Sequence, residues 1–255
     1  MKEAIGEQFH NRNIFDIEDM NIPVYKYMKL EYVISMIKSK ALSISKLSSW
    51  EDPYESFFYK SDFLLSGDKT IQGPNIEQIF GQSWTMQEES DAMWRIYSDK
   101  DNKDSVRIRT TADKLFKATY VNNYCMASTY IGRVKYVSGA EISRWLNSIS
   151  PITDIHDFQH LGIQSFFIKR DSFSHEQEIR VIYHTDSFSP DIQTPHKQYP
   201  IDPDNFIEEI VFDPRLTPAE YTFKLRTLEK LGFNGEKVKL SNLYYFHPEK
   251  ILLQL

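Results

Sequence analysis

The sequence predicts a single α+β domain, because strand-like and helical patterns alternate irregularly along almost its whole length. Short segments rich in β-branched and aromatic residues are interspersed with segments whose apolar residues recur at helical spacing. No internal repeat, low-complexity tract or linker divides the 255 residues. We therefore expect one domain over residues 22–255, preceded by a polar, acidic arm at residues 1–21.

The first elements follow one another closely. Residues 24–27 and 41–45 have the composition of strands, and apolar residues recur at helical spacing between them, from Leu30 to Ile37. This is nearly the shortest chain that can hold a strand, a helix and a second strand. Asp52 precedes a proline and predicts a turn, so Asp52 and Glu55 are expected in a loop directly after the second strand.

The later elements are predicted by the same patterns and by helix-capping residues. Ser90, Thr111 and Thr217 are typical N-cap residues, and Gly232 is a typical helix end. Residues 124–137 predict a hairpin that turns at Ile131-Gly132, and residues 188–203 predict a loop. Strands are expected at 82–85, 105–109, 179–183, 207–212 and 238–240, and helices at 90–97, 111–116, 140–148, 154–164 and 217–231.

Composition narrows the class of protein. Hydrophobic residues make up 41% and charged residues 26%, as in ordinary globular proteins, and the net charge of −6 gives no global basic field for nucleic acid. The single cysteine, Cys125, excludes a disulfide framework and fits a reducing compartment. No apolar run approaches about 18 residues, and the N-terminus lacks the apolar core of a signal peptide. We expect a cytoplasmic protein without a membrane segment.

The most informative stretch is residues 166–183. It contains Lys169-Arg170, a polar turn, and then Glu176 and Glu178 directly before a strand-like run. Residues two apart on a strand point the same way, so the two carboxylates are expected on one face. Such a pair is either a solvated edge strand or a paired-glutamate active site.

Other candidates are open to two interpretations. Trp94 and Tyr97 share a helical face, which suits either core packing or stacking on a ligand. Arg107 and Arg109 alternate with apolar residues, which suits either a solvated strand edge or a clamp for pyrophosphate. The spacing of His156 and His160 can ligate a metal, but without a third ligand a surface or capping role is expected, and no metal is predicted. Phosphate-loop, GxGxxG, HExxH and GxSxG motifs are absent from the sequence.

Four motifs together resemble a family of bacterial domains of unknown function. That family has a Lys-Tyr strand, a loop of the form N-D-P-x-E, then M-W-x-x-Y and E-x-E-x-R. The corresponding segments here are Lys26-Tyr27, Trp50-Glu51-Asp52-Pro53-Tyr54-Glu55, Met93-Trp94-Arg95-Ile96-Tyr97 and Glu176-Gln177-Glu178-Ile179-Arg180. Glu51 stands where the family usually has asparagine. The resemblance extends over residues 25–215.

More remotely, the order of these motifs resembles the ADP-ribosyltransferases. This resemblance implies a split, mostly antiparallel sheet flanked by helices, with NAD as the substrate in the cleft. It implies Glu178 as the catalytic glutamate and Glu176 as a second catalytic group that orients or deprotonates the acceptor. Lys26 stands where those enzymes have histidine or arginine. The implied NAD-binding residues are Tyr25, Lys26, Tyr27, Ser43, Ser45, Trp94, Tyr97, Arg107 and Arg109.

The same resemblance implies transfer of ADP-ribose to a macromolecular acceptor, either nucleic acid or protein. It also implies the context of a toxin or of defence against phage, with partners such as an antitoxin or another defence-system protein. A basic strip that would suit nucleic acid is formed by Lys103, Arg107, Arg109, Lys114 and Lys117.

Two functions from other classes remain open on the residues. One is a magnesium-dependent nuclease that uses the acidic residues Asp52, Glu55, Glu176 and Glu178. The other is a non-enzymatic sensing or scaffolding module, in which the Glu-x-Glu-x-Arg strand is only a salt-bridged edge.

Overall fold

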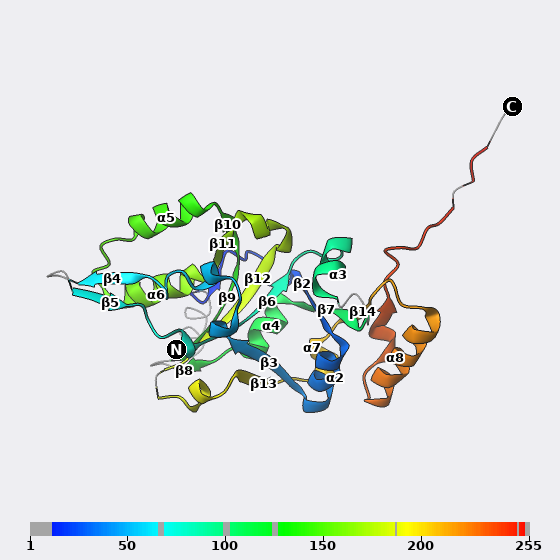
Figure 1. Ribbon diagram of the computed structural model, residues 1–255. Helices are drawn as coiled ribbons and strands as arrows, with labels where there is room; N and C mark the ends of the chain where they lie inside the picture. Colours follow the sequence, from blue (N-terminus) through cyan, green and yellow to red (C-terminus); the bar gives the residue numbers. More distant parts are fainter. Residues whose placement is uncertain are drawn as a thin grey trace.

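The structure is a computed structural model that describes residues 12–65, 69–98, 103–123, 127–186, 188–248 and 250–252. It has a large, mostly antiparallel sheet flanked by helices, which confirms the predicted fold class (Figure 1). The main path of the sheet runs β1-β9-β12-β6-β2-β7-β14-β15, and β3, β8 and β13 join it at the side. Within this sheet the parallel pairs of described strands are β1 with β9 and β14 with β15.

The strands of the large sheet are short and come from the whole length of the chain. They are β1 (Ile14–Phe15), β2 (Pro23–Lys29), β3 (Ala41–Lys46), β6 (Ile79–Thr85), β7 (Ser105–Thr111), β8 (Asn122–Asn123), β9 (Ala127–Arg133), β12 (Glu178–His184), β13 (His196–Pro200), β14 (Glu209–Phe212) and β15 (Val238–Leu240). Two small sheets pair β4 (Asp62–Leu65) with β5 (Lys69–Gln72) and β10 (Lys135–Val137) with β11 (Ile168–Arg170).

Helices begin where the capping residues predict them. Ser90, Thr111 and Thr217 each accept a hydrogen bond from the backbone of the first turn, and Gly232 follows the last helix at φ +86°. The described helices are α2 (Leu30–Ser39), α3 (Asp91–Tyr97), α4 (Ala112–Thr119), α5 (Gly139–Ser148), α6 (Ile155–Ser165), α7 (Pro203–Phe206) and α8 (Pro218–Lys230).

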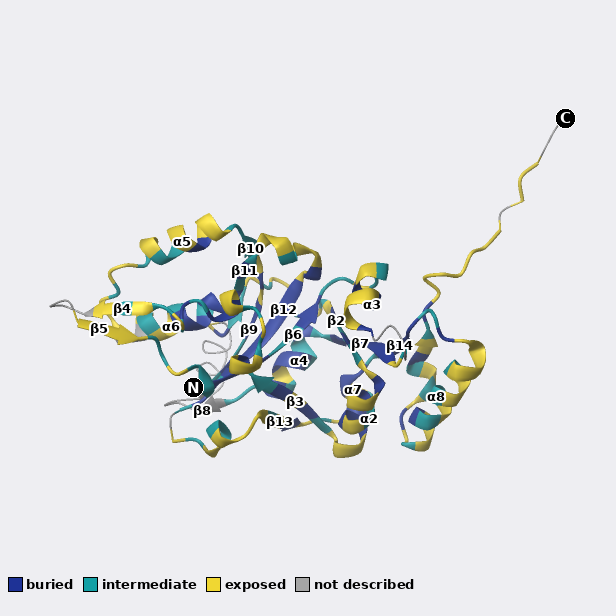
Figure 2. Cartoon of the chain, viewed as in Figure 1, coloured by how far each residue is buried: buried dark blue, intermediate teal, exposed yellow. Residues whose placement is uncertain are grey.

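The main apolar core lies against the central strands, which are the most buried part of the chain (Figure 2). It joins side chains from α2, α4 and α8 to those of the large sheet, for example Val33, Leu115 and Leu228. By contrast, α5 and α8 expose most of their surface at opposite ends of the molecule (Figure 2).

The sheet splits between β2 and β6, and this split positions the candidate site. β6 pairs with β2 at a single position, Tyr25 with Thr85, whereas its other end pairs with β3 at Gly81 and Phe80. Between these two contacts the neighbouring strands diverge, so the sheet leaves backbone groups of β6 without a strand partner on that side. An opening between strands of one sheet is a natural place for a ligand.

Two predictions about the backbone are wrong. Residues 127–133 form the continuous strand β9 and not a hairpin, because Gly132 provides close packing and not a turn: a Cβ there would lie 2.8 Å from Phe15 and Phe167. The predicted loop at 188–203 contains β13, which pairs with β3 as an edge strand.

The predicted arm is partly attached to the sheet, because β1 pairs with β9 and Asn13 donates to the backbone of Thr129 at 2.8 Å. Residues 1–11 and Cys125 lie outside the described residues. The single domain over residues 22–255 stays a prediction. Among the described helices, no segment has both the length and the apolar character needed to cross a bilayer.

Candidate active site

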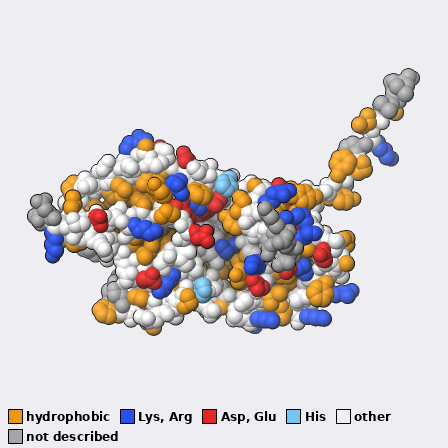
Figure 3. Space-filling view, viewed as in Figure 1, with side chains coloured by type: hydrophobic (Ala, Val, Ile, Leu, Met, Phe, Trp, Pro, Cys, Tyr) orange, Lys and Arg blue, Asp and Glu red, His pale blue; other side chains and the backbone are white. Residues whose placement is uncertain are grey.

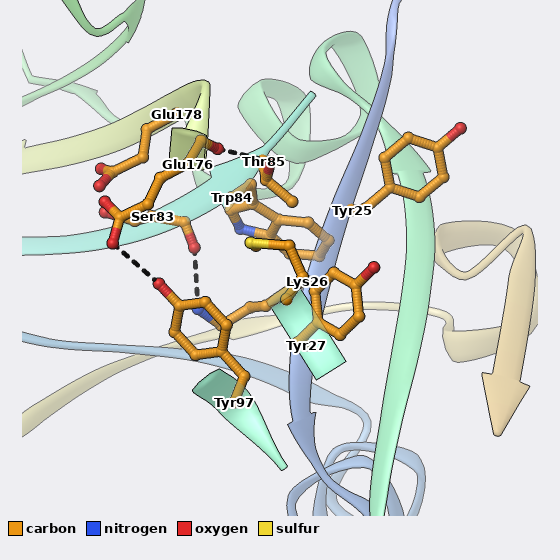
Figure 4. Close-up of a pocket in the computed structure, with 10 residues that line it drawn as sticks. Tyr25, Lys26, Tyr27, Ser83, Trp84, Thr85, Tyr97, Glu176 and Glu178 are labelled. Atoms are coloured by element: carbon orange, nitrogen blue, oxygen red, sulfur yellow. Dashed lines mark hydrogen bonds between the residues drawn. The ribbon is translucent and has the colours of Figure 1, made fainter. Parts of the chain in front are cut away.

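A small pocket of about 90 Å³ lies where β2 and β6 diverge, lined also by residues of α3 and by the start of β12 (Figure 4). Both predicted carboxylates line it. Its lining residues are Tyr25, Lys26, Tyr27, Ser83, Trp84, Thr85, Met93, Tyr97, Glu176 and Glu178. Figure 3 shows acidic side chains gathered near the middle of the molecule, between its two ends.

Glu178 is held by two cations. It is the first residue of β12, opposite Thr85 of β6, and is 5% exposed. Its Oε1 lies 2.7 Å from Lys169 Nζ and its Oε2 lies 2.5 Å from Arg180 Nε. Burial alone would raise the pKa of Glu178, but the charge of Arg180 and the hydrogen bonds around the carboxylate hold this pKa well below its usual range. Glu178 is therefore an ionised, fixed carboxylate.

Glu176 reaches the same lysine by a different route from the one predicted. It does not lie on the strand but ends a short 3₁₀ helix, Asp171–Glu176, and Gln177 at φ 44° turns the chain into β12. Its Oε2 lies 2.5 Å from Lys169 Nζ, and its Oε1 accepts from the Tyr97 hydroxyl at 3.1 Å. Burial and the neighbouring Glu178 raise the pKa of Glu176 to about 7. The pair thus combines one ionised carboxylate with one that titrates near neutrality.

Lys169 lies at the centre of a buried cluster of charges. Its Nζ contacts Glu176, Glu178 and also Glu55, at 3.2 Å from the Oε1 of Glu55. Burial would lower the pKa of Lys169, but the facing carboxylates, Glu178 first, raise it above its ordinary value. Lys169 therefore stays charged and joins three carboxylates that come from two distant parts of the chain.

Arg180 is the second cation of this cluster and is fully buried. Its Nη2 contacts Glu55, its Nη1 donates to the carbonyl of Phe166 at 2.8 Å, and its guanidinium lies 4.8 Å from the ring centre of Trp50. The loop that carries Trp50 and Glu55 is thereby joined to the Glu-x-Glu-x-Arg segment. A second pair, Arg170 with Asp52 at 3.0 Å, strengthens the same junction.

Lys26 bridges the split in the sheet. Its Nζ donates to the carbonyl of Ser83 at 2.8 Å, which is a backbone group of β6 in the stretch where the strand has left β2 (Figure 4). Burial lowers the pKa of Lys26 to about 8, and the charge of Glu178 opposes this shift. The ammonium is therefore close to losing its proton at a mildly alkaline pH.

A wider groove of about 730 Å³ continues from the small pocket, with which it shares Lys26, Tyr27, Ser83 and Tyr97. Ser43 and Ser45 of β3 line this groove and not the small pocket. Its other lining residues are Met28, Lys29, Tyr32, Ser35, Met36, Ser39, Ala41, Trp50, Gly81, Gln82, His196 and Gln198. Among the described residues that line the groove there is no glutamate or aspartate.

Two predicted contacts lie behind the pocket and not in it. Trp94 is fully buried, packs edge-on against Tyr27 with ring centres 4.9 Å apart, and donates its indole N–H to Glu89 at 2.7 Å. Arg107 lies 4.8 Å from the ring centre of Tyr25 and forms a buried ion pair with Glu209 at 2.9 Å. Both side chains hold tyrosines that line the pocket.

The predicted basic strip is not an open row of charges. Arg109 and Lys114 both pair with Glu208, at 3.3 and 2.9 Å, and Lys117 pairs with Asp113 at 2.7 Å. Lys103 donates to the carbonyl of Arg215 at 3.1 Å, and Arg107 is buried. The structure therefore does not bring Arg107 and Arg109 to the pocket as a pair of free guanidinium groups.

Three of the four acidic residues of the nuclease alternative are brought together, but around a cation of the protein itself, and the fourth, Asp52, pairs with Arg170. Lys169 Nζ contacts Glu55, Glu176 and Glu178, which is the position that a divalent ion would need. Within the described residues no group of histidine, cysteine, aspartate and glutamate side chains has the arrangement of a metal site. His160 packs its ring against Phe15, with ring centres 5.7 Å apart.

Several residues of the site were not assigned to it from the sequence, among them Trp50, Ser83, Lys169 and Arg180, and Glu55 was placed beside Glu176 and Glu178 only in the nuclease alternative. Trp50 and Glu55 belong to the predicted loop motif, and Arg180 is the last residue of Glu-x-Glu-x-Arg. Those motifs marked the right segments, but sequence spacing cannot show that two segments more than a hundred residues apart share one buried cluster.

Comparison with known proteins gives a match to part of the chain. A family model described as a protein of unknown function (DUF2971) matches residues 93–181, which contain α3 from Met93 onward and the Glu-x-Glu-x-Arg segment. This match confirms the resemblance to a family of unknown function over that range. A search of curated proteins finds no match.

Solved structures of DarT from Thermus sp. 2.9 are similar to the chain. DarT in complex with NAD+ gives a TM-score of 0.41 at 10% identity, covering 90% of this chain and 100% of that chain. DarT in complex with carba-NAD+ gives 0.40 at 11% identity, covering 89% and 100%. DarT in complex with ADP-ribosylated ssDNA gives 0.41 at 10% identity, covering 89% and 98%.

Proposed function

We propose that this protein is an ADP-ribosyltransferase, which cleaves NAD at the nicotinamide glycosidic bond and transfers ADP-ribose to a macromolecular acceptor. The observation that carries the proposal is the pair Glu176 and Glu178 at the split of the sheet, where a small pocket with both carboxylates opens into a long groove. Folding alone does not call for two buried carboxylates side by side at a pocket, and such pairs are enriched at functional sites.

Glu178 has the properties that cleavage of this bond requires. The nicotinamide of NAD is already a cationic leaving group, so the reaction needs little acid catalysis. Positive charge develops on the ribose as the bond breaks, as in glycoside hydrolysis. A carboxylate that is kept ionised by Arg180 and Lys169 and cannot reorient stabilises this charge without reorganisation.

Glu176 suits the role of general base toward the acceptor. A base works best when its pKa lies near the working pH, and the pKa of Glu176 is raised to about 7. Its hydrogen bond from Tyr97 orients the carboxyl group at the pocket. In the transfer step Glu176 takes the proton of the acceptor, while the acceptor atom forms its bond to the ribose carbon that nicotinamide leaves.

The groove fits NAD in size and chemistry. Its volume of about 730 Å³ lies within the range of about 300–1,000 Å³ that is usual for ligand sites. Tyr27 and Tyr97 offer rings in the groove, and Tyr25 offers one in the adjoining pocket. Ser43 and Ser45 offer hydroxyl groups for sugar or phosphate oxygens, and Lys26 offers positive charge beside Glu178. In this proposal Trp94 and Arg107 support Tyr27 and Tyr25 from behind, and Arg109 stays with Glu208.

The acceptor in this proposal is a nucleic acid or a protein that reaches the open side of the groove. Two lysines and a histidine line the groove, which favours an acceptor with negative charge. An acceptor of this kind implies a toxin or a phage-defence effector, with an antitoxin or another defence protein as its partner, in the bacterial cytoplasm.

The test is release of nicotinamide from NAD by the purified protein, followed by mass spectrometry for ADP-ribose adducts on protein and RNA or DNA from expressing cells. We expect Glu178→Gln to abolish both signals. The matched control is Glu51→Gln, because Glu51 is an exposed acid on the loop that carries Glu55. Unchanged nicotinamide release in a folded Glu178→Gln protein, or none in the wild type, would contradict the proposal.

A further inference from the structure

Trp50 lies where the groove meets the charged cluster. It follows the 3₁₀ helix Leu47–Ser49 and precedes the 3₁₀ helix Pro53–Ser56, so it is carried by a short connecting loop. Its side chain lines the 730 Å³ groove, and its ring lies 4.8 Å from the Arg180 guanidinium. One residue thus contacts both the groove and the cation that holds Glu178.

The indole ring is fixed in place. Arg180 cannot turn, because its nitrogens are bound to Glu178, to Glu55 and to the Phe166 carbonyl, and a flat guanidinium fixes the plane of a ring stacked on it. The loop is also pressed onto β6, where a Cβ at Gly81 would lie 2.6 Å from Leu47. A ring that is already ordered loses little conformational entropy when a ligand covers it.

Part of the Trp50 side chain remains available to bind a ligand. Its indole N–H makes no hydrogen bond with the part of the chain that the structure describes, and the side chain is only half-buried. Amide and hydroxyl groups that can hydrogen-bond to the edge of a ring line the same groove, among them Gln198 and Ser43. Neither packing nor the ion-pair network therefore accounts for all of this side chain.

We propose that the groove face of Trp50 is a stacking subsite for a neutral, planar heteroaromatic ring of the nucleobase type. Neutrality follows from Arg180: a cationic ring on the indole would face a second positive charge through it, whereas a neutral base would not. The nicotinamide ring of NAD, which is cationic until the glycosidic bond breaks, is thereby disfavoured at this position. This subsite adds a ligand contact to the proposed transferase function. It rests on that function only for the identity of the molecule that supplies the ring.

Two sources can supply such a ring: the adenine of NAD or a base of the acceptor. Arg180 touches both Trp50 and Glu178, so the ring lies close to the carboxylates. Unreactive probes separate the sources. ADP-ribose and AMP carry adenine, thymidine monophosphate carries a different base, and ribose 5-phosphate carries no aromatic ring.

The experiment is titration of each probe into the protein, followed by tryptophan fluorescence and by calorimetry. Of the four tryptophans, Trp84 and Trp94 are buried in the core, and Trp145 lines a separate cavity beside Phe15. We expect ring-bearing probes to quench fluorescence in the wild type and in Trp145→Phe, but not in Trp50→Phe. We expect Trp50→Ala to weaken their binding about tenfold, because base–aromatic stacking contributes about 1–3 kcal/mol, and Trp50→Phe to retain most of it.

The outcomes separate this inference from the transferase proposal. Quenching by ADP-ribose and AMP alone assigns the subsite to the adenine, and quenching by thymidine monophosphate as well assigns it to an acceptor base. Nucleotide binding that depends on Trp50 without NAD cleavage would support the subsite and refute the transferase. Equal binding of all ring-bearing probes by wild type and Trp50→Ala would refute the subsite, even if NAD is cleaved.

Discussion

At the scale of single residues, the site depends on which charges face one another. Glu55 is the clearest case, because it connects the loop after β3 to both cations of the cluster. It makes no contact with the small pocket itself. Glu55 is therefore a positioning residue, which acts through Arg180 and Lys169 on the two pocket carboxylates.

Glu55→Gln should destabilise the fold by a few kcal/mol, since removing one partner of a buried ion pair costs about 3–5 kcal/mol and glutamine keeps part of the hydrogen bonding. The measurement is urea unfolding, with Glu51→Gln as the exposed control. Nicotinamide release should fall at saturating NAD, with little change in KM, because Glu55 positions Glu178 through Lys169 and Arg180 and does not line the pocket. A rise in KM alone would contradict this role.

The pH dependence of transfer should follow Glu176. Because its pKa is raised to about 7, the carboxyl group is mostly protonated at pH 6 and mostly ionised at pH 8. A general base must be ionised, so the rate of transfer to the acceptor should rise with pH through about 7. The rising limb should disappear in Glu176→Gln.

The raised pKa of Glu176 also affects stability. The protonated carboxyl group stabilises the folded state fully below the unfolded pKa of about 4.3, and this contribution is lost as the pH rises through about 7.

At the scale of elements, the turn at Gln177 decides where Glu176 points. Gln177 has φ 44°, a left-handed conformation that costs a non-glycine residue about 1 kcal/mol. This turn, and not strand alternation, places the two carboxylates on one lysine. The 3₁₀ helix before it and the strand after it are thus separate supports for the two acids.

Gln177→Gly should raise the midpoint of thermal unfolding by a few degrees and keep nicotinamide release, because glycine adopts this conformation without strain. Gln177→Val should lower both, because a β-branched residue resists positive φ. Lys40→Gly is a matched control with φ 50° at the end of α2, where the same relief should leave activity unchanged. Equal activity of the glycine and valine variants at position 177 would show that the turn does not position Glu176.

Much of this element-level structure follows from local sequence patterns. Ser90 and Thr217 fixed the starts of α3 and α8 because capping is a local interaction. The strand β13 was missed because prolines surround it and its partner β3 lies far away in the sequence. The position of Lys169 among Glu55, Glu176 and Glu178 was missed for the same reason, since no local rule predicts which distant acids a lysine will meet.

At the scale of the whole molecule, Lys26 links the two sides of the split sheet. Its bond to the Ser83 carbonyl replaces a strand-to-strand hydrogen bond in the stretch where β2 and β6 have separated. The split therefore has a defined width near the pocket, set by the length of one lysine side chain.

Lys26→Met should leave the Ser83 carbonyl without its donor, which costs about 1–3 kcal/mol for a buried group. Hydrogen exchange should then increase at residues 79–85 and 23–29, while the control Lys29→Met, at an exposed position of the same strand, should not change it. Lys26→Arg keeps a donor and should restore part of the protection. Unaltered exchange in Lys26→Met would show that the split does not depend on this bond.

The buried cluster of three carboxyl groups and two cations also binds one proton. Its three carboxyl groups, Glu55, Glu176 and Glu178, face two cations, Lys169 and Arg180, so it is electrically neutral only while one carboxyl group is protonated. A ligand that brings a positive charge next to these carboxyl groups compensates the negative charge in place of the proton, and the proton is released. Binding of a cationic dinucleotide should therefore acidify a weakly buffered solution, whereas binding of ADP-ribose, which lacks the cationic ring, should not.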